Sequence, residues 1–135
     1  MLFALNFPPR LRVSALKLMK INYDNRIFKS VSNSESGEVS RETTFHYRQK
    51  DNLVWAEYAG GEIVFGSLIA KVLPDDSLEM RYQHLNKGGE LMTGKCFSKP
   101  EILDDGRIRL YEKWQWTSGD FSSGESVVEE ASSRE

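Results

Sequence analysis

Residues 78–98 read LEMRYQHLNKGGELMTGKCFS, and this stretch decides the fold class. Bulky side chains alternate with polar ones from Leu78 to His84, as in a strand with one buried face. A Lys-Gly-Gly turn follows at 87–89, and a second strand-like segment begins at Leu91. Two such segments joined by a short glycine turn predict an antiparallel hairpin.

The same unit repeats along most of the chain. Turn signals recur roughly every ten residues, and no helix-length periodic segment lies between them. Because sequential strands on short turns pair as neighbours, a long meander can remove its edges by closing. We predict an all-β protein, a single antiparallel up-and-down barrel of about eight strands, with a two-sheet sandwich as the alternative. The expected strands span 26–33, 39–50, 53–58, 63–72, 78–86, 91–98, 108–117 and 122–128.

Composition divides the chain into one domain and two flanking segments. Residues 1–18 are basic and free of acids, and two prolines interrupt them. They are interpreted as a stretch upstream of a working start at Met19, as a transit peptide, or as a short docked element. We expect residues 19–130 to form the barrel domain and 131–135 a disordered acidic tail.

The composition also argues against several classes of partner. The formal net charge is −2 and the basic residues are scattered, so no basic stripe predicts nucleic-acid binding. No apolar run reaches the roughly 20 residues of a membrane helix, and we expect no membrane partner. Cys96 is the only cysteine, which excludes an internal disulfide and fits a cytoplasmic protein.

Two acids fall on faces that we expect to point inward. Alternation puts Glu57 on the bulky face of 53–58 and Glu112 on that of 108–117. An ionised carboxylate buried without a partner is very costly, so such acids must be paired, protonated or hydrated. We therefore favour a polar cavity over a filled barrel. The predicted ligand-binding residues are Trp55, Glu57, Tyr82, His84, Glu112, Trp114 and Trp116.

These residues favour a protein that binds a small polar or cationic metabolite through charge and cation–π contact. One alternative is a small acid–base enzyme that uses Glu57 and Glu112. Another is a structural or interaction module whose barrel is filled. A one-residue register slip in 78–86 would turn Arg81 and Gln83 inward instead.

Signals for catalysis and metal binding are weak. The chain has no Gly-x-Ser-x-Gly motif, and Cys96 reads as a buried, inert thiol. His46 and His84 have no metal-ligand spacing and fall on opposite classes of face. We therefore assign no catalytic residue, metal ligand or cofactor, and we favour a binding protein over an enzyme.

The segment 63–72 carries apolar side chains on both faces. A barrel strand normally wets its outer face, so an exposed apolar stripe favours a homodimer contact or cover by residues 1–18. The alternative is a local bulge that rotates the strand.

Four segments carry a resemblance to a known family. They are MKINYDNRIFKS at 19–30, VWAEYAGGEIVFG at 54–66, MRYQHLNKGGELMTGKC at 80–96 and GRIRLYEKWQWTSGD at 106–120. The chain resembles, over about 19–130, a family of small bacterial proteins often labelled N-acetylglutamate synthase. The resemblance implies a calycin-like barrel, the architecture of lipocalin- and avidin-type binders. The label makes acyl transfer one version of the enzyme alternative.

Overall fold

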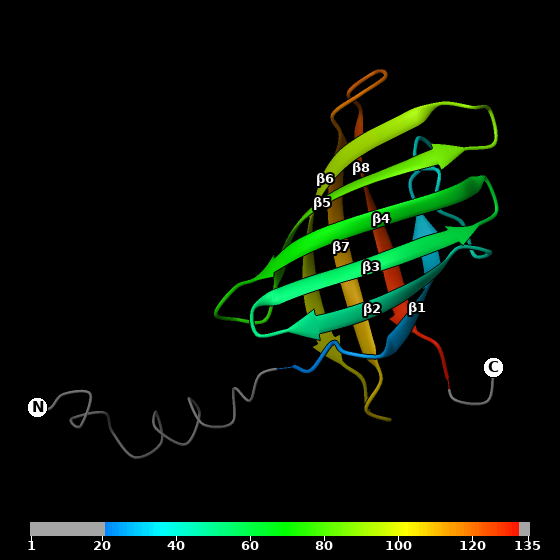
Figure 1. The fold of residues 1–135 in the computed structure, drawn as a ribbon. Coiled ribbons are helices and arrows are strands. Elements are labelled where there is room, and N and C mark those ends of the chain that lie inside the picture. The colour runs from blue at the N-terminus through cyan, green and yellow to red at the C-terminus, as the bar shows by residue number, and fades with distance from the viewer. Residues whose placement is uncertain (1–20, 133–135) are drawn as a thin grey trace, which may run out of the picture.

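Alternating segments on short turns produce the predicted barrel. The computed structural model describes residues 21–132, in which eight antiparallel strands close into one barrel (Figure 1). Each strand pairs with the next along the chain, and β1 pairs with β8 to complete the wall. The up-and-down barrel is confirmed and the sandwich alternative is wrong. The strands are β1 (Arg26–Asn33), β2 (Thr44–Lys50), β3 (Leu53–Gly60), β4 (Ile63–Val72), β5 (Leu78–Asn86), β6 (Leu91–Ile102), β7 (Ile108–Trp116) and β8 (Ser123–Glu130).

The flanking segments are only partly described. The predicted extension at 1–18 and the last three residues of the tail lie outside the described residues. Ala131 is described, and its amide donates a hydrogen bond of 2.7 Å to the carbonyl of Ile27. Within residues 21–132, no helix is long and apolar enough to cross a membrane.

The second strand begins at Thr44, so the predicted strand at 39–43 is wrong. Residues 34–43 form a loop between β1 and β2, which we call the mouth loop. The Thr43 hydroxyl donates to the carbonyl of Gly60 at 3.0 Å, and Val39 packs against the core. These contacts hold the β-forming residues of this segment at one end of the barrel, outside the ladder.

The two ends of the barrel differ. At the end opposite the mouth loop, the fully buried Tyr23 donates its hydroxyl to the carbonyl of Asp76 at 2.6 Å. Leu78 and Ile108, the first residues of their strands, are also fully buried or nearly so. Apolar packing therefore plugs this end, and a cavity can lie only toward the mouth loop.

Alternation predicts the inner faces of β5 and β7 correctly. Met80 and His84 point inward on β5, whereas Arg81 and Gln83 are exposed. The register slip considered for this strand does not occur, because β5 pairs in continuous register with β6 from Leu78 to Leu85.

The inner face predicted for β3 is wrong. Val54, Ala56 and Tyr58 are buried, whereas Trp55 and Glu57 are exposed on the outer wall. Both faces of this strand carry large apolar side chains, so alternation alone does not distinguish them. Pairing with β2 fixes the choice, because Tyr58 lies opposite Phe45 and their rings stack 4.9 Å apart inside the barrel.

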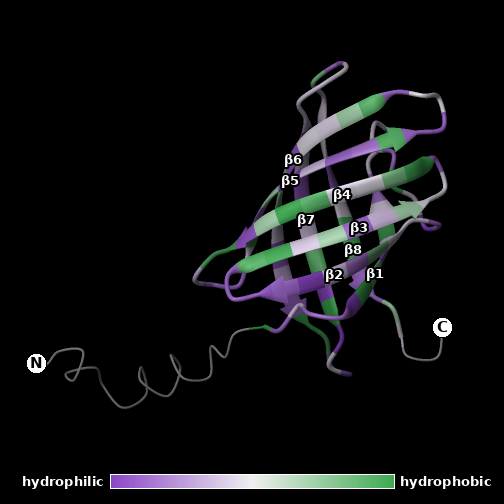
Figure 2. Ribbon diagram, viewed as in Figure 1, coloured by the Kyte–Doolittle hydropathy of each residue, from purple (hydrophilic) through white to green (hydrophobic). Residues whose placement is uncertain are grey.

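The bulge considered for β4 is present. The register with β5 shifts between Ile63 and Phe65, so Ile63 is buried while Val64 and Phe65 are both exposed. Apolar residues run along much of β4 (Figure 2). The bulge therefore accounts for the mixed pattern, and it still leaves apolar side chains on the outer wall.

Gly66 and Gly94 make room for two tyrosine rings. A Cβ atom at Gly66 would overlap the ring of Tyr58, and one at Gly94 would overlap the ring of Tyr82. Both tyrosines can thus lie against a neighbouring strand. These glycines shape the wall of the cavity described below.

Candidate ligand-binding site

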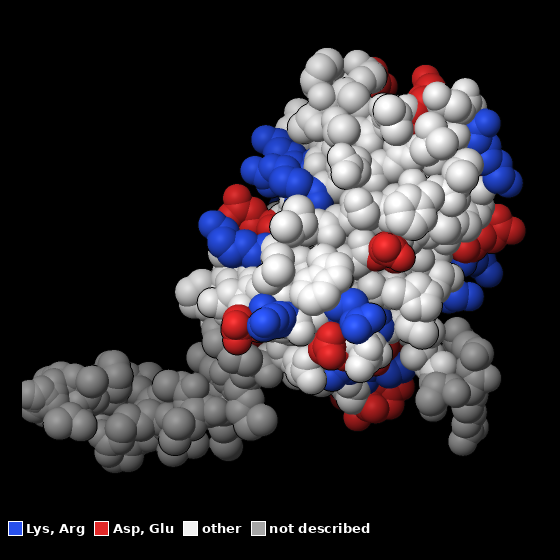
Figure 3. All heavy atoms as spheres, viewed as in Figure 1, with Lys and Arg blue, Asp and Glu red and all other residues white. Residues whose placement is uncertain are grey.

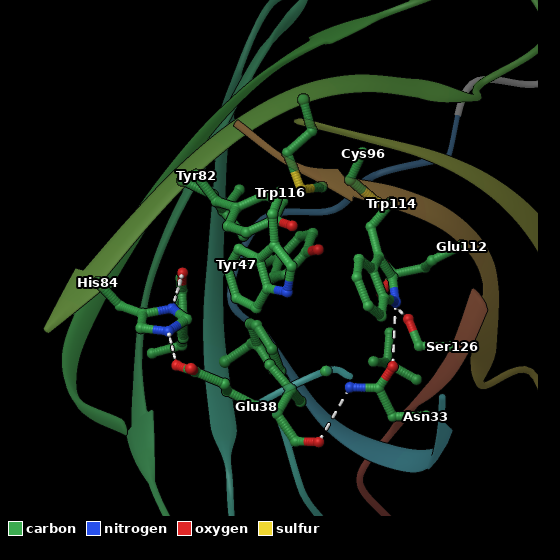
Figure 4. Close-up of a pocket in the computed structure, with 17 residues that line it drawn as sticks. Asn33, Glu38, Tyr47, Tyr82, His84, Cys96, Glu112, Trp114, Trp116 and Ser126 are labelled. Carbon is green, nitrogen blue, oxygen red and sulfur yellow. Dashed lines mark hydrogen bonds and ion pairs between the residues drawn. The ribbon is translucent and has the colours of Figure 1, made fainter. Parts of the chain in front are cut away.

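Five of the seven predicted ligand-binding residues line one interior cavity: Tyr82, His84, Glu112, Trp114 and Trp116 (Figure 4). The inward orientation predicted for Trp55 and Glu57 is wrong, because both lie on the outer wall. Glu57 stands beside His46 and Ser67 in the ladder there. The acid–base pair of Glu57 and Glu112 across the barrel is therefore not formed.

The cavity has a volume of about 50 Å³. A water molecule needs about 10–15 Å³ of such volume, so the cavity has room for a few waters. Its walls are largely aromatic. The ring centroids of Trp114 and Trp116 lie 5.7 Å apart, and Trp116 lies 5.8 Å from Tyr82 and 5.7 Å from His84.

Glu112 lies at the deep end of the cavity. Its carboxylate accepts hydrogen bonds from the hydroxyl of Ser98 at 2.7 Å and from that of Ser126 at 3.1 Å. Burial raises the pKa of Glu112, and the two serine hydroxyls offset part of this rise. Among residues 21–132, no basic side chain forms an ion pair with Glu112. The base of the cavity therefore holds a carboxyl group that no cation of the described residues neutralises.

Two tyrosines place their hydroxyls near this carboxyl group. Tyr47 is almost fully buried, and its pKa is raised first by burial and then by the charge of Glu112. The pKa of Tyr82 is raised by burial and also by Cys96 and Glu112. Among residues 21–132, neither hydroxyl has a hydrogen-bond partner in the structure. Both can therefore donate to, or accept from, a molecule in the cavity.

The mouth loop closes the other side of the cavity. The indole nitrogen of Trp116 donates to the carbonyl of Ser36 at 3.0 Å. The indole nitrogen of Trp114 donates at 3.0 Å to the side chain of Asn33, the last residue of β1. Gly37 lines the cavity from the loop itself.

A carboxylate of the loop also holds His84. Glu38 Oε1 lies 2.8 Å from His84 Nε2, and the other ring nitrogen lies 2.9 Å from the hydroxyl of Tyr58 (Figure 4). Because a carboxylate only accepts hydrogen bonds, Nε2 of His84 must be a donor. The Asn86 amide donates to both oxygens of Glu38, at 3.3 and 3.2 Å.

Sequence reasoning did not identify several residues of the site. Asn33 ends β1 and Glu38 belongs to the mouth loop, which has no periodic pattern. No sequence pattern therefore predicts that these two residues lie at the cavity. Tyr47 and Tyr58 also line the cavity. Tyr47 shares the face of β2 that carries large side chains, and this alternation in the sequence could have predicted that Tyr47 points inward.

The histidines lie on opposite sides of the wall, as alternation predicts: His46 outside and His84 inside. Within the described part of the chain, no three His, Cys, Asp or Glu side chains group as a metal site. Burial, and then the charge of Glu112, raise the pKa of the Cys96 thiol. A neutral, buried thiol is a poor nucleophile.

Comparison with known proteins identifies the family. A search of curated proteins gave no match. The sequence model described as avidin-like protein matches residues 21–131, which include all eight strands and every cavity residue. This match supports the calycin-type barrel and gives no support to the N-acetylglutamate synthase label or to a bacterial source. The chain belongs to the avidin-like protein family.

Proposed function

We propose that this protein binds a small molecule with a cationic amine, and that the amine pairs with Glu112 inside the barrel. The observation that carries the proposal is a buried carboxyl group at the base of an aromatic cavity, with no basic partner among residues 21–132. A buried charge needs a partner, and a ligand amine would supply one. Membership of a barrel family with the architecture of small-molecule binders supports a binding role.

The surrounding groups suit such a ligand. The faces of Trp114 and Trp116 attract a cation through their quadrupoles. The hydroxyls of Tyr47 and Tyr82 offer acceptors for the remaining ammonium hydrogens. The mostly apolar lining favours an aliphatic chain behind the charged group.

A titration with n-hexylamine, followed by tryptophan fluorescence, tests this proposal. We expect binding that Glu112→Gln weakens by about tenfold or more, because a charge-assisted hydrogen bond is lost. Hexanol should bind more weakly than hexylamine. Glu57→Gln is the matched control, since it removes the same charge from the outer wall and should leave the affinity unchanged. Equal affinities of the wild type and Glu112→Gln would refute the proposal.

We also propose that two copies associate through the outer wall of β3 and β4. Exposed apolar side chains gather there: Leu53, Trp55, Val64, Phe65 and Ile69. Figure 3 shows this side of the molecule mostly covered by uncharged side chains. Contiguous apolar surface of this kind is typical of an interaction site.

A further inference from the structure

The mouth loop leaves too little space for a typical ligand. Sites for small molecules usually enclose about 300–1,000 Å³, whereas this cavity measures about 50 Å³. Gly37, Glu38 and Val39 of the loop line the cavity, so the loop itself fills the mouth. A ligand larger than a few waters must therefore displace part of the loop.

The loop contributes hydrogen-bond acceptors to two donors of the cavity. The Ser36 carbonyl accepts from Trp116, and the Glu38 carboxylate accepts from His84. With the loop in place His84 is only 1% exposed in its side chain, and Glu38 is the acceptor at its Nε2 atom. A buried donor that loses its acceptor costs the full desolvation of that group. Displacing the loop therefore costs less for a ligand that brings acceptors of its own than for one that brings none.

We propose that the mouth loop is a built-in competitor, and that the ligand is a dipolar molecule with an amine at one end and a carboxylate at the other. The carboxylate takes the place of the Glu38 side chain at His84 and of the Ser36 carbonyl at Trp116. The amine end rests on the proposed function, in which it pairs with Glu112. The amine then lies at Glu112, and the carboxylate lies at the donors of His84 and Trp116.

The register of β7 sets the length of the ligand. Glu112 and Trp116 lie four positions apart on the same inner face, or about 13 Å at a rise of about 3.3 Å per residue. Both side chains line the same cavity of about 50 Å³, so we expect the charges of the ligand to lie closer together than this. A chain of several methylenes between the two charges meets the requirement, and the aromatic wall would enclose it.

Three probes of one chain length test the inference on the full-length protein: ε-aminocaproate, its neutral amide ε-aminocaproamide, and n-hexylamine. We expect ε-aminocaproate to bind about tenfold more tightly than the amide, because its carboxylate replaces that of Glu38. Glu38→Ala removes the competitor and should tighten ε-aminocaproate binding several-fold. Glu35→Ala, an exposed acid of the same loop, is the matched control and should leave both affinities unchanged.

Hydrogen exchange provides a second readout that needs no variant. The Gly37 amide donates to the Ser34 carbonyl within the closed loop and should lose protection when ε-aminocaproate saturates the site. Hexylamine binding that depends on Glu112, with no gain from a carboxylate and no effect of Glu38→Ala, would overturn this inference alone. If none of the three probes binds, the proposed function falls with it.

Discussion

At the scale of the residue, Glu112 combines burial with two serine donors and no cation among the described residues. Such an arrangement makes the ionised form of the carboxyl group costly. A binding site of this kind lowers the stability of the fold and raises the affinity for the ligand, because the ligand supplies the cation that pairs with the carboxylate.

This cost predicts a pH-dependent stability. The pKa of Glu112 is raised from 4.5 in the folded protein, so the folded state holds a proton that the unfolded state releases. We compare the free energy of unfolding of the wild type with that of Glu112→Gln. The difference should favour the wild type most below pH 4.5, and this advantage should fall as the pH rises through the pKa of Glu112 in the folded protein. Urea unfolding of both proteins between pH 4 and 8 measures the difference. A constant difference across this range would contradict the account.

The alternation of large and polar side chains along the strands predicts much of the cavity lining. On β5 and β7 only one face is bulky, so burial and alternation agree, and His84, Glu112 and Trp116 are placed correctly. On β3 both faces are apolar, and the stacking of Tyr58 on Phe45 decides the orientation. Because this contact joins β2 and β3, the sequence of neither strand alone predicts which face of β3 points inward.

At the scale of the element, the mouth loop controls access to the cavity. At the cavity its hydrogen bonds come from one backbone carbonyl, which accepts from Trp116, and one carboxylate, which accepts from His84 and Asn86. The sequence does not reveal this role, because the hydrogen-bond partners of Glu38 among residues 21–132, His84 and Asn86, lie 46 and 48 positions along the chain. Loop residues take their places from such long-range contacts and not from local periodicity.

The loop predicts the reactivity of Cys96. This thiol lines the cavity, and it is the single free cysteine. Burial raises its pKa, so reaction with iodoacetamide should be slow in the wild type. Glu38→Ala releases the loop from His84 and should accelerate alkylation several-fold, while Glu35→Ala should not. Mass spectrometry of the intact protein follows the reaction, and equal rates would show that the loop does not gate the cavity.

At the scale of the whole molecule, the closed barrel separates two surfaces. The inside holds the aromatic cavity with Glu112 at its base, and the outside of β3 and β4 holds the apolar side chains on which the proposed dimer rests. The bulge in β4 explains why this strand shows no clean alternation in the sequence.

The apolar wall predicts self-association. Ile69 is 57% exposed and lies beside the exposed Trp55. A charge introduced by Ile69→Lys should shift the protein toward the monomer in sedimentation velocity experiments, because burying an unpaired charge is costly. Gln115→Lys, a change on the exposed outer face of β7, should leave the sedimentation coefficient unchanged. A monomeric wild type would exclude the proposed contact.

The pairing of a ligand amine with Glu112 is the central feature of the proposed site. Carbon NMR of the labelled side-chain carboxyl group of Glu112 reports its protonation directly, with and without saturating n-hexylamine. We predict a pKa above 4.5 in the free protein, and a fall when the amine binds, because a nearby cation favours the carboxylate. A Glu112 titration that the bound amine leaves unchanged would contradict the central claim.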